Sequence, residues 1–422
     1  MIRVGVFPCG SEIALEVYRA LKDEKDIELI GISSVEDHGK FVFENYIGEV
    51  PYANSPNFIS SIQKIVEENN IDFIYPCMDI VMPILKKNED FLNCKVITSP
   101  IETVEICLSK KKTYEYLKDF ILVPQVFSTG EIVEFPVFSK PEVGASSRNT
   151  FKINDETDLF YYTKKYPGNL LLEYLPGEEY TVDCFTDSKG NLIYCSPRLR
   201  SRIVNGISVN TKLVKDEKIK LMAESINKKM VFSGSWFFQI KRNIDNDFCL
   251  MEVATRFGGS SVIQRYRGVN FPLLNLYLYR GFDIQIEENE FEIEIDRGLD
   301  IKGKLNIEFG TVYIDLDDTI IVKDKVNSNM MKLIYYFLNI GKKIILISKH
   351  KENIYETLQK YKIDKTIFSQ IIHISKEDEK YKYMSLNSIF IDDSFTERKK
   401  VKNQLNIPTF SVDTINIFYN GN

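Results

Sequence analysis

The segment from Val312 to Ile321, VYIDLDDTII, places three carboxylates within four positions at the end of an apolar run. Carboxylates this close repel one another, so the arrangement persists most easily when a cation neutralises them or one stays protonated. Asp315 and Asp317 are two residues apart, and in a strand both side chains would leave on the same side of the sheet. The segment therefore predicts a metal-dependent site.

Two further apolar runs in the same part of the chain end in polar residues. KKIILIS ends at Ser348, and SIFIDDS carries Asp392 and Asp393. In open α/β sheets, ligands bind beyond the carboxyl ends of the strands. We therefore expect three strands to bring this chemistry to one point. For DLDDT taken alone, the alternative is a calcium-binding or solvent-exposed acidic turn.

DLDDT, Ser348, a downstream lysine and IDDS resemble, in that order, the four motifs of the haloacid dehalogenase (HAD) superfamily of phosphotransferases. The resemblance implies a phosphatase in which Asp315 attacks phosphorus and forms an aspartyl-phosphate. Asp317 would protonate the leaving oxygen and then activate water. Mg²⁺ would be held by Asp315, by the backbone of Asp317 and by the Asp392–Asp393 pair.

The same resemblance assigns the phosphoryl group to Ser348 and to a lysine that precedes the fourth motif. Lys380 is the chosen residue, and Lys376 is its rival because spacing alone does not separate them. Only one helix with its connections fits between Asp315 and Ser348, so no lid domain is expected there. We hypothesise that the preceding domains or a second subunit shield the site.

A second candidate site begins at Lys140, which closes the strand FPVFSK and is followed by PEVGASSRN. A loop of Gly and small Ser residues lets backbone N–H groups approach phosphate oxygens, and the lysine adds positive charge. Alone, the loop also fits a plain hairpin connection.

The segments that follow it are LLLEYLPGEEY, SPRLRSR, WFFQ and MEVATRF. Together with Lys140 they resemble the ATP-grasp superfamily, particularly its carbamoyl phosphate synthase-like and carboxylate–amine ligase branch, over roughly residues 1–290. The resemblance implies ATP and Mg²⁺ as cofactors. The residues that it assigns are Lys110 and Lys140 with the Gly144, Ser146 and Ser147 loop for phosphates, Glu173 and Leu175 for adenine, Glu179 for ribose, Gln239 and Glu252 for Mg²⁺, and Arg256 for the acyl-phosphate.

Three arginines alternate along one expected strand, at Arg198, Arg200 and Arg202. Alternate residues share one face of a strand, so this stripe is expected to bind an anionic substrate or the leaving phosphate. A solvated sheet face is the alternative. Of the three arginines, we expect Arg200 to take part in cofactor binding.

One position departs from the ATP-grasp pattern. EVATR, over residues 252–256, stands where the family usually reads Glu-x-Asn-Pro-Arg. The side chain of Ala254 offers no oxygen for a metal. Either Glu252 holds Mg²⁺ with water and neighbouring groups, or the domain has lost part of its catalytic power.

The pattern of apolar runs predicts an α/β and α+β multidomain protein. Strands alternate with helices over residues 1–100, which predicts a parallel sheet of the pre-ATP-grasp type. Paired strands with turn residues follow over 101–300, which predicts antiparallel sheets. Within that part, a helical stretch is expected over 261–282 and an acidic strand over 285–296. Alternation returns over 311–422, as expected for a capless HAD-like Rossmannoid domain.

The composition of the chain limits the class of protein and the compartment in which it is expected. The 422 residues carry a formal net charge of −6, which does not favour a nucleic-acid or membrane-surface protein. The seven cysteines are scattered without a zinc-site spacing, and free thiols fit a reducing cytoplasm. Neither a signal peptide nor a membrane-spanning run is apparent, so we expect a cytoplasmic protein. The oligomeric state stays open, and a homo-oligomer is compatible with the sequence.

The leading interpretation is a bifunctional enzyme. An ATP-grasp part would join a small-molecule carboxylate to an amine through an acyl-phosphate, and a Mg²⁺-dependent phosphatase part would act on a phosphorylated substrate of the same biosynthetic pathway. The alternative is a HAD phosphatase regulated by a catalytically weakened nucleotide-binding module. A non-catalytic scaffold is disfavoured, because the repelling Asp315 and Asp317 carboxylates would serve no structural purpose.

Overall fold

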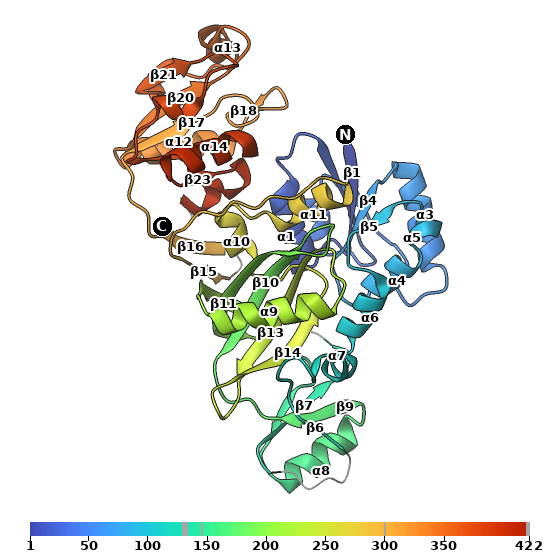
Figure 1. Ribbon diagram of the computed structural model, residues 1–422. Helices are drawn as coiled ribbons and strands as arrows, with labels where there is room; N and C mark the ends of the chain where they lie inside the picture. The colour runs from blue at the N-terminus through green and yellow to red at the C-terminus, as the bar shows by residue number, and fades with distance from the viewer. Residues whose placement is uncertain (129–133, 145–146, 299–300, 419–422) are drawn as a thin grey trace.

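The computed structural model describes residues 1–128, 134–144, 147–298 and 301–418. We call residues 1–100 the N-terminal domain, 101–305 the central domain and 311–418 the C-terminal domain. Figure 1 shows the central domain below the other two, with its small sheet and α8 at the far end. Within the described residues, no helix is long and apolar enough to cross a bilayer.

The N-terminal domain is built on a parallel five-stranded sheet in the order β3-β2-β1-β4-β5. Ser11 accepts a hydrogen bond from the Ala14 amide and caps the first helix, whose Ile13, Val17 and Leu21 are buried. The elements are β1 (Ile2–Phe7), α1 (Glu12–Leu21), β2 (Ile27–Ile32), α2 (Gly39–Val42), β3 (Asn45–Ile47), α3 (Phe58–Asn69), β4 (Phe73–Pro76), α4 (Met82–Lys87), α5 (Glu89–Leu92) and β5 (Lys95–Val96).

The first part of the central domain has two helices, then a small antiparallel sheet in the order β6-β9-β7-β8 and a third helix between β8 and β9. The helices are α6 (Ile101–Leu108), α7 (Lys110–Leu117) and α8 (Glu156–Lys165), and the strands are β6 (Val126–Phe127), β7 (Val137–Pro141), β8 (Phe151–Ile153) and β9 (Asn169–Glu173). Here Lys140 lies in β7, beside β9.

A seven-stranded antiparallel sheet, in the order β14-β13-β10-β11-β12-β15-β16, completes the central domain. Apolar residues of α9 pack on one face against Trp236 and Phe238, which are buried. The opposite face, which we call the polar face, carries Glu179, Thr181 and Gln239 beside the apolar Phe185 and Phe237. The elements are β10 (Glu179–Thr186), β11 (Leu192–Val204), β12 (Ile207–Leu213), α9 (Glu217–Lys229), β13 (Gly234–Arg242), β14 (Phe248–Ala254), α10 (Val262–Tyr266), α11 (Phe271–Tyr279), β15 (Ile293–Arg297) and β16 (Ile301–Leu305).

Two local expectations differ from the structure. The helical stretch over 261–282 is two helices, because the chain turns at Gly268, which has a φ of +99°. The acidic segment over 285–296 forms a strand only from Ile293, where its pairing with β16 begins.

The C-terminal domain holds a parallel five-stranded sheet in the order β21-β20-β17-β22-β23, with a hairpin, β18–β19, directly after β17. The strands are β17 (Thr311–Ile314), β18 (Ile321–Val322), β19 (Lys325–Val326), β20 (Lys343–Ser348), β21 (Gln370–His373), β22 (Ser388–Ile391) and β23 (Thr409–Phe410). The helices are α12 (Ser328–Asn339), α13 (Ile354–Lys360) and α14 (Phe395–Leu405), with 3₁₀ turns η1 (Lys365–Ile367), η2 (Lys380–Tyr383) and η3 (Val412–Phe418).

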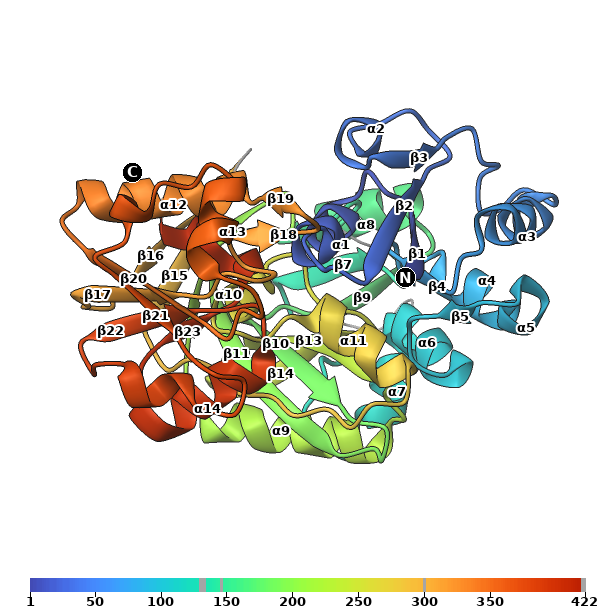
Figure 2. The same ribbon diagram turned by 90° about the horizontal axis from the view of Figure 1, so that it is seen from above.

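A buried polar junction ties the three domains together at Arg265 of α10. Its guanidinium donates to Glu16 of α1 at 2.8 Å and to the Asp413 carbonyl oxygen of η3 at 2.6 Å. Asn270 adds a hydrogen bond of 2.9 Å to the Ala20 carbonyl. These contacts hold α1 between the central and C-terminal domains, as Figure 2 shows from above.

Replacing Arg265 by Met is expected to destabilise the protein by about 3–5 kcal/mol, because two buried carboxylates would lose their cation. Arg202→Met is the matched control. Arg202 pairs with Asp296 at the surface, where both side chains are more than 40% exposed, so its loss should cost less than about 1 kcal/mol. Urea unfolding of both variants measures the difference, and equal midpoints would contradict it.

Candidate functional site

The three strands that were expected to converge are neighbours. β17 lies between β20 and β22, and Ile314 is in register with Leu346 on one side and Ile391 on the other. Asp315, Ser348 and the Asp392–Asp393 pair therefore all lie at the carboxyl edge of one parallel sheet.

Asp315, Asp392 and Asp393 form a cluster whose carboxylate oxygens lie within 4.8 Å of one another. Lys380 of η2 is buried among them, with its Nζ 2.6 Å from Asp315 Oδ1 and 2.6 Å from Asp392 Oδ2. Lys376 is exposed on the preceding turn. The structure thus places Lys380, and not Lys376, in the cluster.

When all four groups are ionised, the three carboxylates and the one ammonium group leave the cluster with two more negative charges than positive charges. Burial, with Asp392 adding to it, raises the pKa of Asp315 to about 8, against the opposing effect of Lys380. Burial and Asp392 also raise the pKa of Asp393 to about 6. Burial disfavours the charged form of Lys380, but Asp315 and Asp392 outweigh it and raise the pKa of Lys380. The three carboxylates converge on one point and leave excess negative charge there, which suits a divalent cation such as Mg²⁺.

Asp317 lies outside this cluster, with its side chain half exposed. Its two oxygens are 2.9 and 3.0 Å from Nδ1 of His350, whose Nε2 is 2.8 Å from Thr357 Oγ1. His350 is not among the residues that the sequence analysis assigns to this site. No motif spacing links His350 to Asp317, because β20 and the loop after it bring the two together.

Ser348 is 1% exposed, and its Oγ makes no hydrogen bond within the described part of the chain. A buried hydroxyl without a partner is uncommon in folded proteins. The position at the end of β20 fits an oxygen or N–H partner supplied by a ligand.

In the central domain, the two lysines predicted to contact phosphates are both buried. Lys140 Nζ donates to the Met251 carbonyl at 3.1 Å, and Lys110 Nζ donates to the Gly144 carbonyl at 3.0 Å. Burial, followed by the like charge of Lys110, lowers the pKa of Lys140 to about 7, while Glu252 opposes this. The Lys140 ammonium is therefore poorly compensated and would gain from an anionic ligand.

The polar face of the seven-stranded sheet brings Glu179, Gln239 and Glu252 together. Gln239 is in register with Glu252 across β13 and β14, and with Thr181 across β10. Glu252 forms no hydrogen bond or ion pair with any described residue, so its oxygens are available to a metal. Ala254 lies opposite Phe237 and supplies no ligand atom.

Each arginine of the stripe on β11 has its own carboxylate. Arg198 pairs with the buried Asp183 at 2.8 Å. Arg200 donates to Glu179, and to Gln239 Oε1 at 2.9 Å. The register is irregular between Arg200 and Arg202, which turns outward. The stripe is therefore neither a solvated face nor a single array of unpaired cations.

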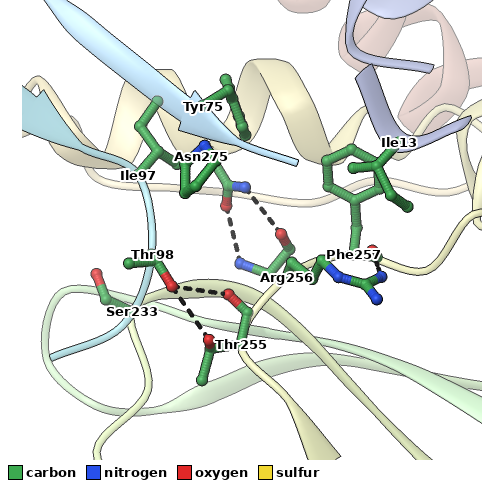
Figure 3. A pocket seen from close by; sticks show the side chains of 11 residues that line it. Ile13, Tyr75, Ile97, Thr98, Ser233, Thr255, Arg256, Phe257 and Asn275 are labelled. Atoms are coloured by element: carbon green, nitrogen blue, oxygen red, sulfur yellow. Dashed lines mark hydrogen bonds between the residues drawn. The ribbon is translucent and has the colours of Figure 1, made fainter. Parts of the chain in front are cut away.

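Arg256 is bound by a residue from another domain that the sequence analysis missed. Asp79, in the loop after β4, accepts from Arg256 Nε at 2.6 Å and from Nη2 at 2.8 Å. Burial would raise the pKa of Asp79, but Arg256 outweighs burial and lowers it. Figure 3 shows Arg256 at a small cavity between the N-terminal and central domains, with Thr98 bonded to Thr255.

The remaining predicted residues that the structure describes lie in the small sheet or in the segments next to its strands. Glu173 ends β9, and its Oε2 accepts from the Gln125 amide at 3.3 Å. Leu175 is buried. Gly144 receives the bond from Lys110, and Ser147 has a φ of +48°. Ser146 lies outside the described residues.

Comparison with known proteins supports the ATP-grasp resemblance. Residues 165–301 match the model of a family described as ATP-grasp in the biosynthetic pathway with Ter operon. A D-alanine–D-alanine ligase from Thermotoga petrophila is 28% identical over 110 residues, which is 24% of this chain and only 36% of that ligase. The expected cofactors, ATP and Mg²⁺, agree with this superfamily.

Solved structures share the fold over 70% of the chain. Biotin carboxylase from Campylobacter jejuni, in a complex with a β,γ-ATP compound, aligns with a TM-score of 0.58 at 17% identity over 75% of its length. An L-amino acid ligase from Bacillus licheniformis aligns with a TM-score of 0.57 at 17% identity over 79% of its length. A Hydrogenobacter thermophilus 2-oxoglutarate carboxylase domain, solved with the magnesium salt of ADP, aligns with a TM-score of 0.58 at 17% identity over 74% of its length. At these identities the likeness shows the fold alone.

Proposed function

We propose that this protein is an ATP-dependent carboxylate–amine ligase joined to a Mg²⁺-dependent phosphatase of the same biosynthetic pathway. Two features carry the ligase proposal. The ammonium group of Lys140 is buried with little opposite charge to balance it. Glu252, on the seven-stranded sheet, forms no hydrogen bond or ion pair with any described residue. The fold shared with ATP-dependent ligases and carboxylases, and the match over residues 165–301, add support.

In the ligase reaction, a carboxylate oxygen attacks the γ-phosphorus of ATP, which gives an acyl-phosphate and ADP. An amine nitrogen then attacks the acyl carbon, phosphate leaves, and the nitrogen loses a proton. Lys110 and Lys140 would hold the phosphates, and Gln239 with Glu252 would hold Mg²⁺, which neutralises phosphate charge when bound. Arg256, kept in place by Asp79, would face the acyl-phosphate.

In the phosphatase reaction, Asp315 attacks phosphorus, and the leaving oxygen takes a proton from Asp317. Water, activated by Asp317, then hydrolyses the aspartyl-phosphate to phosphate and free Asp315. Ser348 and Lys380 would hold the phosphoryl oxygens. Asp315 with the Asp392–Asp393 pair would hold Mg²⁺, which screens the attacking carboxylate from the anionic phosphate when bound.

ADP release from ATP and Mg²⁺, measured with a panel of carboxylates in the presence and absence of amines, tests the ligase. The proposal requires release that depends on both partners. Nucleotide binding without turnover, combined with phosphate release that changes when ATP is added, would favour the alternative. In that alternative, the site weakened at Ala254 binds nucleotide and regulates the phosphatase.

ATP affinity is expected to fall as the pH rises from 7 to 9. The pKa of Lys140 is about 7 in the free protein, and phosphates beside it would raise that pKa, so binding takes up a proton. The dissociation constant should therefore increase by up to about tenfold per pH unit above 7. Isothermal titration in buffers of different ionisation enthalpy measures both quantities, and a constant affinity would contradict the prediction.

A further inference from the structure

The N-terminal domain reaches the C-terminal site through the turn that joins α1 to β2, which we call the 22–26 turn. Lys25 Nζ lies 2.6 Å from Asp318 Oδ2, a contact across 293 positions of the chain. Asp318 directly follows Asp317, the proposed acid and base. The turn is held there by α1, whose Glu16 is anchored to Arg265 and thereby to η3.

Other charged residues of the 22–26 turn also interact with the C-terminal domain. Lys25 acts on Asp393 and opposes the rise in the pKa of that carboxyl. The charge of Lys323, at the tip of the β18–β19 hairpin, acts on Asp23, and the charge of Arg398 of α14 acts on Glu24. The 22–26 turn therefore contacts the segment after β17 and lies near the loop after β22.

Lys25 differs from the other cations of the site in how strongly its present partner holds it. Lys380 is buried between two carboxylates, and Lys349 is paired with the largely buried Glu397. The Lys25 side chain is 52% exposed and that of Asp318 is 32% exposed. An exposed pair of this kind contributes only about 0–1 kcal/mol, so exchanging Asp318 for another anion costs little. Lysine also has a flexible stem and three rotatable donors.

We propose that the 22–26 turn is the cover of the C-terminal site, and that Lys25 binds an anionic group on the leaving portion of the phosphatase substrate. This inference rests on the proposed phosphatase. Because the central domain is proposed to act on carboxylates, the substrate class that fits both sites is a phosphate monoester that also bears a carboxylate. The phosphoryl group would enter the Asp315 cluster, and the carboxylate would displace Asp318 from Lys25.

Steady-state phosphate release from two matched probes tests the inference in the full-length protein. The probes are 4-carboxyphenyl phosphate and its carboxyl methyl ester, which differ in one negative charge remote from phosphorus. For Lys25→Met we expect KM to rise at least about tenfold with 4-carboxyphenyl phosphate and less than about twofold with the ester, at similar kcat. Lys25→Arg should restore most of the discrimination.

Lys22→Met is the matched control, because Lys22 is exposed on the same turn and, among the residues that the structure describes, its ion pair is with Asp23, at 3.8 Å. Equal effects of Lys25→Met on both probes, or no effect on either, would overturn the role of Lys25 while leaving the phosphatase standing. Absence of phosphate release by the unaltered protein from either probe with Mg²⁺ would overturn the phosphatase and this inference with it.

Discussion

Replacing Asp315 by Asn is expected to lower Mg²⁺-dependent phosphate release by more than about 10³-fold, because the amide is not a nucleophile toward phosphorus. The change keeps the size of the side chain, and Lys380 keeps its ion pair with Asp392 at 2.6 Å. The loss should therefore appear in kcat without unfolding. Phosphate release from aryl phosphates, followed alongside the far-ultraviolet circular dichroism spectrum, separates the two effects.

Glu377→Gln is the control, because this exposed carboxylate lies in the same domain, on the turn before Lys380. It should leave phosphate release within about twofold of the original. Activity retained in Asp315→Asn would exclude the aspartyl-phosphate mechanism, and an equal loss in both variants would point to a general effect of charge on the domain.

The second large effect is expected at Lys140. Lys140→Met keeps the apolar stem of the side chain but removes the ammonium group that we propose contacts the nucleotide phosphates. Losing one preorganised electrostatic contact of this kind lowers turnover by about 10²–10³-fold. ADP release with a carboxylate and an amine measures the loss, which should be accompanied by weaker ATP binding.

Lys111→Met provides the comparison, since Lys111 is exposed on α7 next to the buried Lys110. We expect it to leave ADP release nearly unchanged. Similar ADP release by the Lys140 and Lys111 variants would contradict nucleotide binding at Lys140.

Local patterns were sufficient to predict the strands that carry the chemistry. Asp315, Ser348 and Asp392 each follow an apolar run, and the structure places those three runs side by side in one parallel sheet. Parallel strands share a direction, so residues that end them must share an edge. The same reasoning separated the antiparallel central domain from its parallel neighbours.

Contacts between distant segments could not be predicted in this way. Asp79 binds Arg256 across 177 positions, and Lys25 binds Asp318 across 293. Both pairs depend on how whole domains pack, and no spacing within either segment records that packing. The choice of Lys380 over Lys376 has the same origin, because the 3₁₀ turn η2 decides which lysine faces the carboxylates.

Exposed and buried arginines also look alike in a sequence. The alternation of Arg198, Arg200 and Arg202 correctly suggests a strand, but their partners lie on β10 and β15. A carboxylate opposite each arginine turns a possible anion-binding face into a set of ion pairs. Arg200, held by Glu179 and Gln239, would have to release at least one of them for both to bind ATP and Mg²⁺.

Thermal unfolding with and without ATP and Mg²⁺ is the most direct test of a nucleotide site at Lys140. The proteins are Asp315→Asn, which cannot consume a phosphate ester at the C-terminal site, and the Asp315→Asn/Lys140→Ala double variant. ATP at about 100 times its dissociation constant should add roughly 2.7 kcal/mol to the domain that binds it, enough to raise its transition by several degrees. We expect this shift in the single variant and its loss in the double variant. An equal shift in both, or none in the single variant, would contradict a nucleotide site at Lys140.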